Sequence, residues 1–401
     1  MSFLSYESTR PWAKAMKTAV LTKKMPPWFA DPHFGKFAND RTMSQADIDT
    51  LTAWADTGAK PGDMKDAPVA IAFVEGWRIG QPDAVIEMPE AFNVPAEGTV
   101  DYQYVVIPTN FKEDKYVQFA EARPGNPALV HHILSFIREP GNKWLEGLKP
   151  GQIVSSGAGA QRAEAEKHPR KGGEVQEGGG GLGGGDFLAG YAPGALPNEM
   201  KPGQAKFIPA GSDIILQLHY TATGKAGTDK SRIGLIFAKE KPTERVLTLA
   251  AANWQFTIPA NDPAYKVESK MKLYEGATLI SLIPHMHFRG KDFTYVATYP
   301  TGEKETLLAV PKYDFNWQLT YELAQPKLLP KGTVIECVAH FDNSANNPAN
   351  PDPTKEVHFG EQTWEEMMIG FFDVAVKTGM GPMDLVMPKK QVASAHSGGI
   401  Q

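Results

Sequence analysis

The chain has 401 residues, of which 42% are hydrophobic, and this length favours two or three domains with sizeable cores. Its 41 Lys and Arg against 46 Asp and Glu give a formal net charge of −5, which offers no electrostatic attraction to nucleic acid or to an anionic membrane. Cys337 is the only cysteine, which excludes an intramolecular disulfide, a zinc site of several thiolates and a c-type haem attachment motif, leaving histidine and methionine as soft metal ligands.

The chain contains no obvious targeting or membrane segment. No apolar run reaches the roughly 18 residues of a transmembrane helix, and residues 1–24 lack the apolar core of a signal peptide. As written, the chain is expected to be soluble and untargeted.

The first part of the chain, residues 1–66, is predicted to be helical. Trp12 and Val20 belong to a set of apolar residues at helical spacing. A second helix is predicted between Ser44, which suits the N-cap, and Gly58, which suits the stop.

From about residue 67 short alternating runs replace the helical period. Tyr102 and Tyr104 belong to one such run and residues 214–220 form another, a pattern typical of antiparallel sandwiches or jelly rolls. A second set of strands is predicted from about residue 256 to 380, including 266–273, 277–287, 291–299, 315–321, 333–341 and 364–376. We therefore expect a mainly β protein with two consecutive antiparallel β-sandwich domains, residues 67–255 and 256–381. The glycine-rich run at 172–190 predicts a flexible surface loop, and residues 382–401 a flexible tail.

His285 and His287 end an apolar strand. Alternate side chains of a strand project to the same face, so these two imidazoles can bind one metal ion. The alternative is a pair of exposed or packed histidines without a metal.

His131 and His132 are adjacent within another apolar strand. Adjacent residues of a regular strand face opposite ways, so both can bind one ion only if the strand is bulged, bent or ending there. His219 lies in a third strand, with Gln217 two residues earlier on the same face. A lone strand histidine is more often a hydrogen-bonded structural residue.

Met367 and Met368 lie in the predicted strand 364–376 and point to opposite faces, and either alone would be ordinary core filler. Of the remaining histidines, His340 lies in an apolar strand, where a structural role is favoured. The other histidines lie in polar or turn-rich surroundings and are expected to be solvated. Together, the histidines and methionine suggest copper.

The order of these motifs along the chain is similar to that of a known protein family. A His-His dyad, Gln-x-His-Tyr, His-x-His-x-x-Gly-Lys and a late Glu-Met occur in that order within residues 68–380. This set resembles the copper type II, ascorbate-dependent monooxygenases, which include peptidylglycine alpha-hydroxylating and dopamine beta-monooxygenases. In that family two jelly-roll-like domains each hold one copper and face each other across a solvent-filled cleft. The resemblance implies hydroxylation of a C–H bond of a small organic substrate, with O₂ and an external electron donor such as ascorbate.

The resemblance also implies which residues hold the two copper ions. The ligands of the electron-transfer copper would be His131, His132 and His219. Those of the oxygen-activating copper would be His285, His287 and Met367. Gln217 matches a glutamine near the first copper that is linked to the electron route. Imidazole suits copper and a thioether favours Cu(I), which agrees with these roles.

Two positions depart from the peptide-hydroxylating members. Ile283 stands where an arginine holds the substrate carboxylate, and Phe371 replaces a tyrosine after the methionine ligand. Amidation of peptides is therefore not expected.

The N-terminal segment carries a separate resemblance. Met25-Pro26-Pro27-Trp28 is similar to the element that supplies the axial methionine in a class of bacterial c-type cytochromes. This implies that residues 1–66 are a helical remnant of a cytochrome domain, with Met25 a haem ligand only in a longer parent protein. The alternative is a small helical lead-in packed on the following domain. The resemblance places the parent in a bacterial periplasm or outside the cell, with a signal peptide upstream of Met1.

Other functions compatible with the residues stay open. The runner-up is a copper-binding or electron-transfer module that hydroxylates nothing. A third is a zinc-dependent hydrolase or binding protein, against which the methionine argues. Without any metal, a two-domain β-sandwich interaction protein remains.

Overall fold

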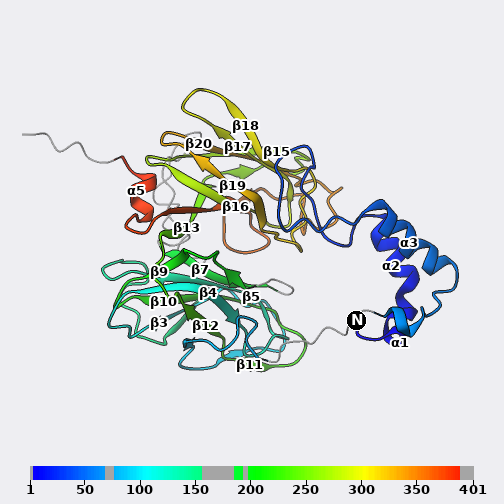
Figure 1. Cartoon of the computed structure of the whole chain (residues 1–401), viewed down its shortest axis with the longest axis horizontal. Helices are drawn as coiled ribbons and strands as arrows, with labels where there is room; N and C mark the ends of the chain where they lie inside the picture. The colour runs from blue at the N-terminus through cyan, green and yellow to red at the C-terminus, as the bar shows by residue number, and fades with distance from the viewer. Residues whose placement is uncertain (1–2, 68–75, 156–184, 193–196, 389–401) are drawn as a thin grey trace, which may run out of the picture.

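The computed structural model describes residues 3–67, 76–155, 185–192 and 197–388. Two β units lie side by side, with a group of short helices next to them (Figure 1). The first β unit covers residues 76–237 and the second residues 244–388, each without the residues outside the described ranges. The expected fold class, a mainly β protein of antiparallel sheets with a short helical N-terminal segment, is confirmed.

The first β unit is a sandwich of two sheets around an aliphatic core. One sheet is formed by β1 (Ala84–Glu87), β12 (Arg232–Phe237), β4 (Lys115–Arg123) and β9 (Gln204–Ile208), with β8 (Asn198–Glu199) paired to β4. The other has the order β6 (Ile153–Ser155), β3 (Gln103–Pro108), β10 (Asp213–Tyr220), β5 (Val130–Arg138) and β7 (Asp186–Tyr191). A two-stranded ribbon joins β2 (Phe92–Val94) to β11 (Gly227–Asp229). Side chains such as Ile133, Leu216 and Leu235 are fully buried between the sheets.

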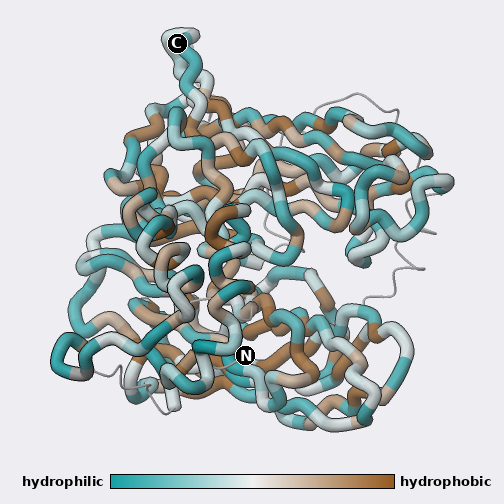
Figure 2. The backbone as a smooth tube through the Cα atoms, turned by 90° about the vertical axis from the view of Figure 1, so that its right-hand side faces the viewer, coloured by the Kyte–Doolittle hydropathy of each residue, from teal (hydrophilic) through white to brown (hydrophobic). Residues whose placement is uncertain are grey.

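The second β unit is built in the same way. One sheet contains β13 (Glu244–Asn253), β22 (Met368–Lys377), β16 (Ala277–His285) and β19 (Tyr321–Leu329). The facing sheet has the order β15 (Tyr265–Lys272), β20 (Val334–Phe341), β17 (Gly290–Thr298) and β18 (Lys304–Val310). β14 (Thr257–Ile258) pairs with β21 (Val357–His358). Leu279, Phe293 and Phe372 are fully buried in this core, and Figure 2 shows the hydrophobic stretches of chain within both units.

The boundary expected at residues 255 and 256 differs from the structure. β13 pairs with β22 along ten residues, and Leu247 and Leu249 pack in the second core. The strand therefore belongs to the second unit, because its apolar face is buried there. β13 also pairs in parallel with β9 over two residues, so one sheet runs through both units.

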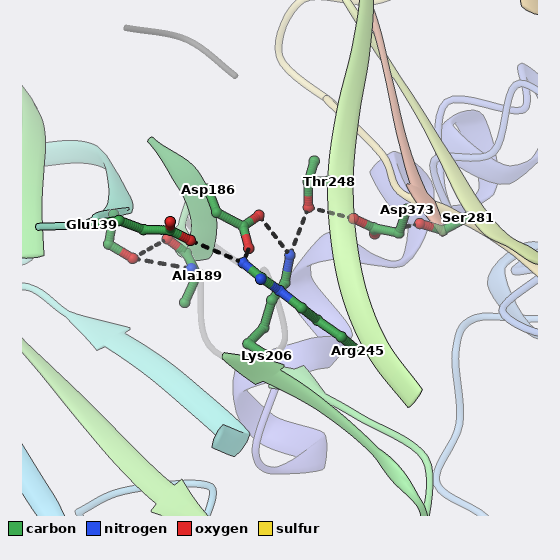
Figure 3. Close-up of polar contacts among 9 residues, drawn as sticks. Glu139, Asp186, Ala189, Lys206, Arg245, Thr248, Ser281 and Asp373 are labelled. Atoms are coloured by element: carbon green, nitrogen blue, oxygen red, sulfur yellow. Dashed lines mark hydrogen bonds and ion pairs between the residues drawn. The ribbon is translucent and has the colours of Figure 1, made fainter. Parts of the chain in front are cut away.

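A buried polar network joins the two units where these strands meet (Figure 3). Asp186, from the first unit, lies 3.5 Å from Lys206 Nζ and 3.4 Å from Arg245 NH2. The Lys206 ammonium donates to Thr248 Oγ1 at 3.0 Å, on β13 of the second unit. The Lys206 and Asp186 side chains are 1% and 2% exposed. Opposite charges balance each other in this network, as burial requires.

Three other strand expectations are corrected. Residues 315–320 form a loop and β19 begins only at Tyr321, while β22 begins at Met368 rather than at 364. β18 (Lys304–Val310) was not expected from the sequence pattern. Its burial pattern has two adjacent buried residues, Leu307 and Leu308, which breaks the simple alternation that marks a half-buried strand.

The N-terminal helices form a small cluster of their own. They are α1 (Tyr6–Thr9), the 3-10 turn η1 (Arg10–Trp12), α2 (Ala13–Leu21) and α3 (Gln45–Asp56); a further turn, η2 (Met64–Asp66), follows. Ser44 caps α3 as predicted, accepting a hydrogen bond from the Asp47 amide. α2 and α3 meet through small side chains, Ala13 and Ala55.

The segment between α2 and α3 packs on the second β unit, not on the unit that follows it in sequence. The Trp28 ring lies 4.9 Å from the Tyr321 ring and 5.9 Å from the Phe37 ring, measured between centroids. Phe37 also forms a β-bridge with Leu323. Aromatic burial against β19 therefore decides where this segment docks, whereas the Met25 side chain is 43% exposed.

The C-terminal part differs from the expected tail. Residues 382–386 form helix α5 (Pro382–Val386), and Leu385 and Val386 are buried in the second core. Most of the glycine-rich run lies outside the described residues. Within the described part of the chain, no helix is both long and apolar enough to cross a membrane.

Candidate metal centre

The His131, His132 and His219 side chains come together as a histidine triad. His132 on β5 is the cross-strand partner of His219 on β10, so both project from the same face of the sheet. The register then shifts, because Tyr220 pairs with Val130 rather than with His131. His131 is thus the extra residue of a β-bulge, which removes the strict alternation that would turn it to the other face.

The nitrogen atoms of the triad converge. The Nδ1 atoms of His131 and His132 are 3.2 Å apart. One ring nitrogen from each of the three residues lies within 4.8 Å of the others, and the ring centroids are 4.9–5.5 Å apart. His219 Nδ1 is buried and has no hydrogen-bond partner among the described residues. A buried ring nitrogen without a hydrogen-bond partner is free to bind a metal ion.

Burial keeps the triad uncharged near neutral pH. It lowers the pKa of His131, and it lowers the pKa of His219 to about 4. The pKa of His132 is also well below its ordinary value, through burial first and the neighbouring imidazoles second. Because only the neutral ring has a free lone pair, these shifts favour metal binding over protonation.

His285 and His287 form a second site, the histidine pair. His285 ends β16 and His287 follows two residues later, so the two rings lie on one side with centroids 5.3 Å apart. Burial lowers the pKa of both residues, for His287 to about 3. The pair therefore also presents neutral imidazoles.

Polar partners hold the Nδ1 atoms of this pair. His285 Nδ1 lies 2.5 Å from Gln318 Oε1, and His287 Nδ1 lies 3.3 Å from the Glu365 carbonyl oxygen. An acceptor at Nδ1 fixes the proton there and leaves Nε2 as the metal ligand. The pair thus differs from His131 and His132 of the triad, whose Nδ1 atoms approach each other.

The two methionines are separated by the sheet. Met368 is fully buried in the core of the second unit. Met367 lies on the opposite face, in a small apolar cluster with Ile369 and Phe371. Ile369 is the cross-strand partner of His285. The ring centroid of His285 is 6.2 Å from that of Phe371. Met367 is therefore the methionine on the face that carries His285, although it precedes β22 rather than lying within it.

Glu366 ties the pair to the Met367 segment. Its two carboxylate oxygens accept hydrogen bonds from the amides of His287 at 2.9 Å and Arg289 at 2.6 Å. Burial raises the pKa of Glu366 to about 8, and the amides and the Arg289 guanidinium act in the opposite direction. These bonds position His287 beside the chain that carries Met367.

The triad and the pair both lie near one contact between the two units. The Tyr102 ring packs on His132 and His219, and the neighbouring Asp101 accepts a hydrogen bond from Gln362 of the second unit. Three residues after Gln362, the Glu365 carbonyl contacts His287. The sequence alone could not show this proximity, because the residues lie in different β units.

Gln217 lies on β10 two residues before His219 and has a hydrogen-bond partner that the sequence pattern did not indicate. Its amide donates a short hydrogen bond to the Tyr104 hydroxyl, and Tyr104 in turn donates to Glu361 Oε1 at 3.1 Å. Tyr102, on the same face, packs its ring 4.8 Å from that of His219. The only signal in the sequence was the alternation of Tyr102 and Tyr104, which predicted a strand but not the hydrogen bonds of Tyr104 to Gln217 and Glu361.

Other histidines lie elsewhere. His340 Nδ1 is 2.7 Å from Oδ1 of Asp292, its partner on the neighbouring strand β17 of the same sheet. His358 contacts Thr257, and His33 contacts Asp31. These local partners fit structural or surface roles.

Comparison with known proteins adds little. No protein-family model matches the sequence, and no curated protein matches it. Among solved structures, the VP2 subviral particle of infectious bursal disease virus is 10% identical, with a TM-score of 0.21 over 76% of this chain and 74% of that chain. The structure of Sulfolobus Turreted Icosahedral Virus is 12% identical, with a TM-score of 0.19 over 67% and 90% of the two chains.

Proposed function

We propose that this protein is a copper-dependent monooxygenase that hydroxylates a C–H bond of a small organic molecule. The observation that carries the proposal is the bulge at His131, which gathers three neutral imidazoles near the contact between the units that also adjoins a second neutral pair. Such a bulge leaves one residue out of the ladder, and here that residue brings a third imidazole to the site.

The donor sets suit copper in two different roles. The triad offers imidazole nitrogens alone, and the pair offers two imidazoles with the Met367 thioether as the candidate third ligand. A thioether favours Cu(I), whereas zinc draws on Cys, His and carboxylate ligands. Copper bound at these residues would supply one-electron transfer at the triad and oxygen activation at the pair.

The protein's own residues prepare the pair for that chemistry. Gln318 and the Glu365 carbonyl hold the Nδ1 protons, so both Nε2 atoms stay available. Ile283 and Phe371 are cross-strand partners next to His285 and make this side of the pair apolar. The reaction balances as R–H with O₂, two electrons and two protons giving R–OH and water, with both electrons from an external donor such as ascorbate.

The decisive experiment combines metal counting with product analysis. The copper-to-protein ratio is measured after reconstitution and removal of loose metal, for the wild type, His131→Ala and His285→Ala. We expect two copper ions in the wild type and one in each variant, with ¹⁸O from O₂ entering a hydroxylated product in an ascorbate-supported substrate screen.

Other outcomes reassign the protein. Two bound copper ions with reductant-dependent redox cycling but no hydroxylated product would favour a copper-binding or electron-transfer module. Zinc bound more tightly than Cu(I), without a contribution from Met367, would favour a zinc protein. No tight metal at all would contradict the proposal.

A further inference from the structure

The two β units touch close to both histidine sites, through residues that no motif marks. Besides the bond from Tyr104 to Glu361, the Gln362 side chain donates to Asp101 Oδ1 at 3.4 Å. Asp101 directly precedes Tyr102, and Tyr104 follows it two residues later. The Tyr102 ring packs on His132 and His219. The strand beside the triad thus contacts the segment 361–362 of the other unit.

The Tyr104 hydroxyl has a defined direction in this contact. It accepts from the Gln217 amide and donates to Glu361, so its single proton is committed to the other unit. Burial raises the pKa of Tyr104, which keeps the hydroxyl protonated. Tyr104 therefore acts as a fixed donor at the boundary between the units.

The segment that receives this bond is itself tightly folded. The Gly360 amide donates to the Glu366 carbonyl at 3.0 Å, and the Glu366 amide donates to the His358 carbonyl at 3.1 Å. Between them, the Gln362 amide donates to Glu365 Oε2 at 3.1 Å. A displacement at Glu361 is therefore passed on to Glu365 and Glu366.

These last two residues hold the histidine pair. The Glu365 carbonyl faces His287 Nδ1, and the Glu366 carboxylate binds the His287 and Arg289 amides. The contacts lead without a gap from Tyr104 in the first unit to His287 in the second.

We propose that Tyr104 is a positioning residue for the histidine pair and acts on it through Glu361. The expected effect on copper binding rests on the proposed function. The expected effect on the mobility of the chain around His287 concerns the metal-free protein and does not. The specific consequence is that removing the Tyr104 hydroxyl, near the triad, loosens the histidine pair in the other unit.

The variant Tyr104→Phe tests this without taking the units apart. It removes only the hydroxyl, and the buried network of Lys206, Asp186 and Arg245 still joins the units elsewhere (Figure 3). Tyr116→Phe is the matched control, because the Tyr116 ring packs on Phe207 and its hydroxyl makes no described hydrogen bond.

Amide hydrogen exchange of the metal-free protein is the first measurement. We expect peptides covering 286–290 and 358–367 to exchange roughly tenfold faster in Tyr104→Phe, the effect of losing about one hydrogen bond. Glu361→Leu should do the same, whereas Glu361→Gln keeps an oxygen acceptor and should stay near the wild type. A peptide covering β20 reports on the rest of the second unit and should not change.

Two results would overturn the proposal. One is a wild-type exchange rate in both peptides of Tyr104→Phe. The other is equal acceleration of every peptide, β20 included, which would show general loosening instead of positioning.

Copper provides the second measurement. In a His131→Ala background, which disables the triad, Tyr104→Phe should weaken Cu(I) binding at the pair roughly tenfold and shift its Cu(II) resonance spectrum, while Tyr116→Phe should do neither. If the His131→Ala protein bound no copper, the proposed oxygen-activating site would be wrong, and the exchange result would still decide the role of Tyr104.

Discussion

The Gln318 side chain determines which nitrogen of His285 is free. Its Oε1 lies 2.5 Å from His285 Nδ1, although the two residues are 33 positions apart. Partners of this kind orient metal-binding histidines and raise their affinity. The sequence pattern identified His285 but not Gln318, because the loop at 315–320 was expected to be a strand.

Replacing Gln318 by leucine tests this contact. The substitution removes the acceptor at a similar size, so the His285 ring can carry its proton on either nitrogen. We expect Gln318→Leu in a His131→Ala background to weaken Cu(I) binding at the pair by roughly 10–100-fold, measured by competition with a chelator. Gln45→Leu on helix α3, far from both sites, serves as control, and equal affinities in the two proteins would contradict the assignment.

The buried imidazoles also predict how stability depends on pH. The pKa of His219 is about 4 in the folded protein and that of His287 about 3, against about 6.5 when unfolded. Below about pH 6.5 the unfolded chain therefore binds protons that the folded chain does not. Stability is fully present above that pH and is lost as the pH falls, by up to about 1.4 kcal/mol per pH unit for each histidine.

The measurement is the urea unfolding midpoint of the metal-free protein at pH 7 and pH 5. His219→Gln should lose less stability on acidification than the wild type, because its side chain does not titrate. Parallel losses in the two proteins would show that His219 does not contribute.

Helix α5 illustrates how an element can escape a pattern-based prediction. Its five residues are too few to show a helical period, and the surrounding sequence is polar and small. Tertiary packing decides its structure, since the Tyr274 amide donates to the Leu385 carbonyl and the Leu385 side chain is fully buried. By contrast, α3 was predictable because Ser44 and the apolar spacing are local signals.

Truncation of Leu385 should reveal this packing. We expect Leu385→Ala to lower the free energy of unfolding of the second unit by about 2–5 kcal/mol, the range for large-to-small core substitutions. Thermal unfolding measures the change. The Met383 side chain on the same helix is 62% exposed, so Met383→Ala should have little effect in the same experiment. If α5 were a loose tail, the two variants would behave alike.

The molecule as a whole depends on how the two units are joined. The sheet that continues through β9 and β13 and the network around Lys206 and Asp186 fix their relative orientation. Removal of one partner from a buried ion pair is costly because it leaves a charge without compensation. The network should therefore couple the unfolding of the two units.

Lys206→Met tests this coupling. We expect a loss of about 3–5 kcal/mol in the free energy of unfolding and a split of the thermal transition into two. Lys230→Met is the matched control: Lys230 pairs with Glu87 at 3.0 Å on the surface, where an ion pair contributes at most about 1 kcal/mol. A single, unshifted transition in Lys206→Met would contradict a joining role.

The sequence by itself determined what depends on local pattern. Alternation predicted the β architecture, a cap and apolar spacing predicted α3, and the order of the histidine motifs singled out the residues that the structure gathers into the triad and the pair. Only the tertiary structure decided how they meet. The bulge at His131 is a property of the pairing with β10, and the Tyr104 contact joins residues 257 positions apart. Register and packing between distant segments are set by the whole folded chain, so no local window contains them.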